Sequence, residues 1–105
     1  MSGGRMKRAD ECENIGEIRK EIDRIDRSII SRIAERAEYV AAAAKYKKSG
    51  DEVKAADRVK TMIAARREWA AARGCAPDFI EDLFRGIVSF FVAEEMKKWK
   101  KEKIE

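Results

Sequence analysis

Two charged residues, Arg36 and Glu95, occupy positions where helical periodicity predicts apolar side chains. One series steps by three or four residues, as the inward stripe of a helix does: Ile15, Ile18, Ile22, Ile25, Ile29, Ile33, Arg36 and Val40. A second series contains the other anomaly: Leu83, Ile87, Phe91, Glu95 and Trp99. An arginine keeps its charge, so it is costly on an inward face unless an anion meets it. The two residues predict an enclosed polar ligand that carries negative charge.

Three further cations, Arg19, Lys47 and Arg58, extend this hypothesis. Lys47 lies eleven residues after Arg36 and returns to nearly the same helical face. Arg19 lies seventeen residues before Arg36, about 25 Å along a helix axis and about 100° away from its face. One small ligand cannot touch both arginines of a single helix, but an antiparallel partner helix could bring a second Arg19 to it. Arg58 would face the same pocket from just beyond the intervening loop.

The residue types restrict the chemistry of such a site. The chain has no histidine, and its two cysteines, Cys12 and Cys75, match no metal-binding spacing. A catalytic triad, a zinc centre and thiolate catalysis are therefore not expected, and no cofactor or metal is predicted. The cations could hold a flexible dianion in a reactive shape and stabilise charge as it develops. Pericyclic reactions need this and no protein nucleophile.

A purely structural interpretation stays open at this point. Arg36 and Glu95 could form a salt bridge with each other, and Arg19 and Arg58 could be ordinary surface residues. The large aromatic side chains, Trp69 among them, are expected in the core.

The first helix that must position these residues is predicted over about 15–47. Asn14 is its expected N-cap, with Glu17 three residues on, as in a capping box. Such a helix would be close to 50 Å long, whereas a compact domain of this size is roughly 26 Å across. Part of its apolar stripe must therefore pack on another chain.

Two shorter helices are predicted to follow. Residues 48–52 break the pattern as a loop, and the second helix is expected over about 54–73, ended by Gly74. Pro77 suits the first turn of the third helix. No alternating pattern predicts a strand. The expected fold is an all-α subunit, one long and two shorter helices, in an intertwined homodimer.

Composition excludes several classes of function. The formal net charge is +4, but acidic and basic residues are interleaved, and a cationic cluster forms only over residues 97–103. Nucleic-acid binding is therefore not expected. No segment approaches the ~20 apolar residues of a membrane span, and free thiols suit a cytoplasmic location. Residues 1–5 are expected to be an added extension before a natural start at Met6, which leaves residues 6–105 as one domain.

Six elements of the sequence occur together at a distinctive spacing. They are IRKEIDRID at 18–26, Arg36, YVAAA at 39–43, KYK at 45–47, DRV at 57–59 and FVAEE at 91–95. Together they resemble the all-helical chorismate mutase family. RREWA at 66–70 and GCAPDF at 74–79 resemble its isochorismate pyruvate lyase branch.

The resemblance implies a homodimer with two equivalent sites for a dicarboxylate. Arg36 and the Arg19 of the partner subunit would bind the two carboxylates. Lys47 would contact the ether oxygen and a carboxylate, and Arg58 would support the loop side. The remaining residues expected in the pocket are Val40, Val59 and Phe91.

Two positions bear on which reaction the resemblance implies. Glu95 stands where the family commonly has a glutamine facing the ether oxygen, and a carboxyl group there must be protonated. Val59 stands where typical chorismate mutases have a glutamate that binds the substrate hydroxyl, and where the lyase branch has valine. The resemblance thus implies conversion of isochorismate to salicylate and pyruvate, with secondary chorismate mutase activity. The alternatives are a chorismate mutase proper, making prephenate, and, more distantly, a non-catalytic helical dimer that binds nucleic acid or protein.

Overall fold

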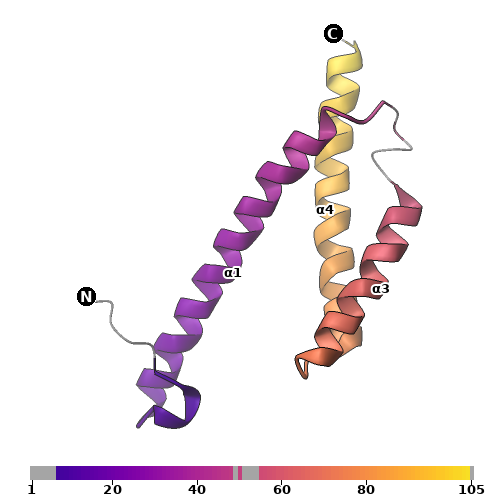
Figure 1. The fold of residues 1–105 in the computed structure, drawn as a ribbon. Helices are drawn as coiled ribbons and strands as arrows, with labels where there is room; N and C mark the ends of the chain where they lie inside the picture. The colour runs from indigo at the N-terminus through magenta and orange to yellow at the C-terminus, as the bar shows by residue number, and fades with distance from the viewer. Residues whose placement is uncertain (1–6, 49, 51–54, 105) are drawn as a thin grey trace. The chain divides into compact units, whose positions relative to one another are not determined.

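Three helices make up most of the described chain (Figure 1). The computed structural model describes residues 7–48, 50 and 55–104. A 3₁₀ turn at Ala9–Glu11 precedes α1 (Ile15–Ala44), α3 (Ala56–Ala72) and α4 (Pro77–Ile104), and these ranges contain no strand. The predicted all-α class is confirmed. The expected extension at residues 1–5 and most of the expected loop at 48–52 lie outside the described residues.

The chain divides into two compact units, and each is described by itself. The first unit ends at Glu38 and contains most of α1. The second begins at Tyr39 and contains the end of α1 with α3 and α4.

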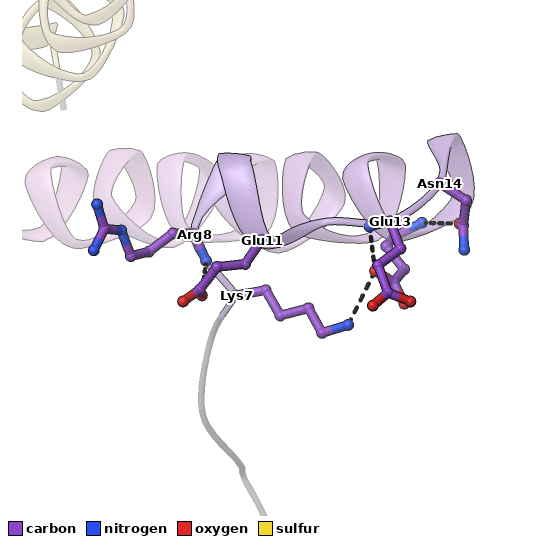
Figure 2. Close-up of polar contacts among 6 residues, drawn as sticks. Lys7, Arg8, Glu11, Glu13 and Asn14 are labelled. Carbon is purple, nitrogen blue, oxygen red and sulfur yellow. Dashed lines mark hydrogen bonds and ion pairs between the residues drawn. The ribbon is translucent and has the colours of Figure 1, made fainter.

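The start of α1 follows the predicted cap (Figure 2). The side-chain oxygen of Asn14 accepts the backbone N–H of Glu17 at 2.9 Å. The Glu17 carboxylate accepts the N–H of Glu13 at 2.9 Å, one residue before the partner of a standard capping box. From this cap α1 continues unbroken to Ala44, a length of about 45 Å at 1.5 Å per residue.

The end of α1 lies three residues before the predicted one. Beyond Ala44, the N–H groups of Lys45, Tyr46 and Lys47 bond to carbonyls three residues back, at 3.3, 3.0 and 3.2 Å. This tighter pattern replaces the α-helical one. Lys47 is therefore beyond the helix, and the prediction that it shares a helical face with Arg36 is wrong.

The isoleucine stripe of α1 is exposed in the single chain. None of the residues of α1 is buried. The stripe isoleucines retain between 36% (Ile33) and 58% (Ile15) of their accessible surface. A continuous row of exposed large apolar side chains is typical of an interaction surface.

Helices α3 and α4 run antiparallel and pack side by side in the second unit (Figure 1). Met62, Ile63 and Ala70 of α3 are buried between the helices' facing sides. Trp69, which was expected in the core, is 59% exposed. Its ring instead stacks on Arg66, whose guanidinium carbon lies 4.8 Å from the ring centroid. The core prediction for Trp69 is wrong for the single chain, in which the ring is exposed and makes a cation–π contact with Arg66.

The turn between α3 and α4 closes at the predicted glycine. Gly74 has a φ of +76°, a left-handed conformation that glycine adopts without strain. Its N–H bonds to the Ala71 carbonyl at 3.1 Å, and the N–H of Cys75 bonds to the Ala70 carbonyl at 2.8 Å. These are the two bonds of a Schellman motif. Pro77 then begins α4, as expected.

An ionic network, the α3–α4 clamp, ties the two helices together beside this turn. Arg67 of α3 lies 2.9 Å from Asp78 and 2.8 Å from Glu81, both on α4. Glu81 also binds Arg85 at 2.7 Å. The hydrogen bonds from Arg85 and Arg67 lower the pKa of Glu81, and those to Asp78 and Glu81 raise the pKa of Arg67.

Candidate active site

An ion pair joins the segment after α1 to α4 within the second unit. Lys47 Nζ lies 3.0 Å from Glu95 Oε2, and the two side chains are 26% and 7% exposed. Among the described residues, Glu95 is the charged residue that is buried. A buried carboxylate is unfavourable without a counter-charge, which the Lys47 ammonium supplies. The structure thus brings together two of the residues predicted to be catalytic.

The apolar residues predicted for the pocket lie in the same unit. Phe91 precedes Glu95 by one turn of α4 and is half-buried. Its ring meets Phe90 edge-on, with the ring centroids 5.1 Å apart. Val40 is half-buried near the end of α1. These positions put apolar side chains on α4, which bears Glu95, and near the end of α1, which lies three residues before Lys47.

A groove between α3 and α4 is lined in part by Val59. The lining residues are Ala56, Val59, Lys60, Arg85, Val88, Ser89 and Val92. Val88 and Val92 precede Glu95 on α4 by seven and three residues, but Glu95 itself does not line the groove. The lining contains two cations and no carboxylate.

Of the seven lining residues only Val59 was predicted for the site, and the three polar residues that were missed are Lys60, Arg85 and Ser89. Arg85 and Ser89 are spaced by four on α4, and Lys60 directly follows Val59. That spacing was the available signal. It was weak, because charged residues at such spacing are common on solvated helices.

Arg58 lies exposed in the first turn of α3. It forms no ion pair with any residue that the structure describes. Ala55, which precedes the helix, has a φ of 39° and provides no side-chain cap. The Arg58 guanidinium is therefore available to an anionic ligand.

The two other predicted arginines, Arg19 and Arg36, lie on α1 in the first unit. Both fall within the unbroken helix, which separates their backbones by about 25 Å, as predicted. Arg19 is exposed and has no ion-pair partner within the described ranges, and Arg36 is half-buried. One small ligand cannot touch both side chains of the same α1.

The described residues form neither a metal-binding cluster nor a helix that could span a membrane. In the described ranges, no three histidine, cysteine, aspartate or glutamate side chains gather as metal ligands would. Cys12 and Cys75 are both free thiols. None of the helices described combines the length and the apolarity that crossing a membrane requires.

The fold and these residues define a small all-α protein with several cations and one buried carboxylate on its helices. Residues 18–96 match the family model of chorismate mutase type II. The chain is 37% identical over 95 residues to the isochorismate pyruvate lyase of Pseudomonas aeruginosa, covering 90% of this chain and 94% of that relative.

Two further relatives match this chain through one part of their own length. The T-protein of Enterobacter agglomerans is 35% identical over 72 residues, and that of Haemophilus influenzae 36% over 84 residues. These matches cover 68% and 79% of this chain, but only 19% and 22% of the T-proteins. The chain belongs to the chorismate mutase type II family and is an enzyme of its pericyclic isomerase and lyase class.

Proposed function

We propose that this protein is an isochorismate pyruvate lyase. The carbon–oxygen bond between ring and side chain breaks while a hydrogen moves from the ring to the methylene carbon of the side chain, which yields salicylate and pyruvate. The observation that carries the proposal is Val59 in a groove lined without any carboxylate. A glutamate at that position would favour chorismate, whose hydroxyl it could bind. Similarity to the Pseudomonas aeruginosa lyase over nearly its whole length supports the same choice.

In this proposal the cations hold the dianionic substrate in its reactive conformation. Arg36 and the Arg19 of a partner subunit each bind one carboxylate through a guanidinium fork. Lys47 leaves Glu95 to contact the ether oxygen, where negative charge develops as the bond breaks. Glu95 then takes up a proton from solvent and donates a hydrogen bond to the same region of the substrate. Phe91 and Val40 keep water away from the reacting carbons.

The proposed site requires an intertwined dimer. The exposed isoleucine stripe of α1 supports this, because a monomer would leave it in water. The length of α1 supports it as well, because Arg19 and Arg36 can meet one ligand only if they come from different copies.

Mixing two inactive variants tests the shared site. Arg19→Ala and Arg36→Ala homodimers should each be nearly inactive, since every site lacks one arginine. After subunit exchange, each mixed dimer has one intact and one doubly defective site. About one quarter of the wild-type activity should then return. Mixing without recovery, while exchange is verified by a mass tag, would place both arginines in the site of one subunit.

A chorismate mutase proper is the second candidate. It is favoured by the match to the family model and by similarity to the two T-proteins. The same cationic pocket could fold chorismate into the shape that rearranges to prephenate.

A direct assay separates the two candidates. Purified protein is given isochorismate or chorismate, and salicylate fluorescence, pyruvate and prephenate are measured. We expect salicylate and pyruvate in equal amounts from isochorismate, and a slower formation of prephenate from chorismate. Prephenate without salicylate would establish the mutase instead. Turnover of neither substrate, with salt-sensitive binding to DNA, would favour a non-catalytic dimer.

A further inference from the structure

The residues ahead of α1 fold back against its first turn (Figure 2). We call residues 7–14 the N-terminal hook. Within it, the N–H of Glu11 bonds to the Arg8 carbonyl at 2.9 Å, and the Glu11 carboxylate accepts the N–H of Arg8 at 2.9 Å. These reciprocal bonds close a small turn, so the hook has a defined shape of its own.

Glu17 fastens the hook to the helix. One oxygen of its carboxylate accepts both the N–H of Glu13 at 2.9 Å and the ammonium of Lys7 at 3.0 Å. Its own N–H donates to Asn14, as described above. The bond from Glu13 and the ion pair with Lys7 lower the pKa of Glu17, and the hydrogen bond to Glu17 raises the pKa of Lys7. Two hook residues, Lys7 and Glu13, thus converge on the Glu17 carboxylate, and a third, Asn14, binds the backbone of the same residue.

Gly16 leaves room for this arrangement. A Cβ atom at Gly16 would lie 3.1 Å from the Asn14 side-chain oxygen, tighter than an ordinary contact. A larger residue would therefore crowd the amide that caps the helix.

Arg19 depends on the first turn for its position. It lies two residues after Glu17, is exposed, and has no ion pair within the described part of the chain. No ion pair with a described residue therefore fixes its guanidinium. The first N–H groups of a helix have no intrahelical partner, and a helix start without a cap frays.

We propose that the N-terminal hook is a positioning element that orders the first turn of α1 and so presents Arg19 to a carboxylate of the substrate. The inference rests on the proposed function, in which Arg19 completes the site of the partner subunit. Glu17 is the central positioning residue, and it does not touch the ligand. An arginine held in place before binding loses less conformational freedom when the ligand arrives, which favours affinity.

The experiment compares Glu17→Ala with Glu21→Ala. Glu21 is the matched control, because it lies as far from Arg19 on the other side and pairs only with Arg24, at 2.8 Å. Glu17→Ala removes the acceptor for Lys7 and for the Glu13 N–H but keeps the Asn14 cap, and it should raise KM for isochorismate about threefold to tenfold, with kcat nearly unchanged. Glu17→Gln keeps an acceptor for the Glu13 N–H and should recover most of the affinity. Glu21→Ala should leave KM unchanged.

The same substitution made in an Arg19→Ala protein distinguishes positioning of Arg19 from a general destabilisation of the fold. In an Arg19→Ala protein, Glu17→Ala should have no further effect on KM, because the side chain it orders is gone. An equal effect in both backgrounds, or equal effects of Glu17→Ala and Glu21→Ala, would overturn the proposal while leaving the lyase activity established. A wild-type protein that turns over neither substrate would instead overturn the proposed function. Hydrogen exchange at the amides of residues 18–20 measures the order of this part of α1 without any substrate. We expect this exchange to be faster in Glu17→Ala than in the wild type.

Discussion

The first unit and the α3–α4 pair are stabilised by different kinds of contact. Met62, Ile63 and Ala70 are buried in the pair, and the α3–α4 clamp links its helices across their turn. The described part of the first unit has no buried residue, and ion pairs such as Arg24–Glu21 and Arg32–Glu35 join neighbouring turns of α1. The pair therefore has a core of its own, whereas the stripe of α1 needs a surface from elsewhere.

The residues with proposed chemical roles are divided in the same way. The Lys47–Glu95 pair and Arg58 belong to the second unit, and Arg19 and Arg36 to the first. Substitutions can therefore be chosen that affect one unit at a time.

Removal of the cation in the isoleucine stripe should have the largest effect. Arg36→Ala is expected to lower kcat/KM about 100-fold or more, because a guanidinium fork for a substrate carboxylate is lost. Circular dichroism and sedimentation should still report a folded dimer. Arg32→Ala is the control, since Arg32 is exposed and pairs only with Glu35 at 2.7 Å. An unfolded Arg36→Ala protein would indicate a structural salt bridge instead.

A charge placed in the stripe should separate the subunits. Ile25→Glu is expected to give a monomer at micromolar concentration and to abolish activity, because the carboxylate would have to be buried in the interface. The helical signal of α3 and α4 should persist. Ile30→Glu is the control, since Ile30 is 67% exposed and lies about 100° from the stripe. If both variants remain dimeric, the stripe is not the interface.

Neutralising the buried carboxylate should change the pH profile. If Glu95 must be protonated for catalysis, wild-type activity falls as the pH rises. Glu95→Gln removes the ionisable group and should give a nearly flat profile between about pH 5 and 8. Glu94→Gln alters the neighbouring glutamate, which pairs with Lys97 at 3.4 Å, and should keep the wild-type profile. A flat wild-type profile would contradict the requirement for a proton.

Weakening the α3–α4 clamp should have the smallest effect. Glu81→Gln is expected to lower Tm by about 2 °C or less at neutral pH, since exposed ion pairs contribute little. Folding lowers the pKa of Glu81, so its contribution is present above the ordinary glutamate range and is lost as the pH falls through the lowered value. The Tm difference should therefore shrink in acid. Glu68→Gln, on the same pair of helices, should show neither effect.

The helices were predictable from local signals, but their chemical contacts were not. Asn14, Gly74 and Pro77 mark helix ends through bonds to residues a few positions away, and all three act as predicted. The end of α1 was misplaced because alanine and lysine allow both the α-helix and the tighter turn that follows Ala44.

The Lys47–Glu95 contact could not be predicted from the sequence. Both residues were selected for the site, but which cation meets Glu95 depends on packing between segments 48 positions apart in the chain. The core prediction for Trp69 was wrong for a related reason, since an apolar ring in the sequence gives no sign of the cation–π contact that it makes with Arg66. Periodicity identifies the inward face of a helix, but it does not identify the partner on that face.

The short turn at Gly74 has a consequence for the order of folding. Because residues 73–76 join α3 directly to α4, the contacts of this pair close a very small loop, which forms on the order of microseconds to milliseconds. The stripe of α1 has no such local partner and must wait for an encounter between two chains. Refolding should therefore begin with a fast phase whose rate is independent of protein concentration. A slower phase, in which activity returns, should accelerate as the concentration rises.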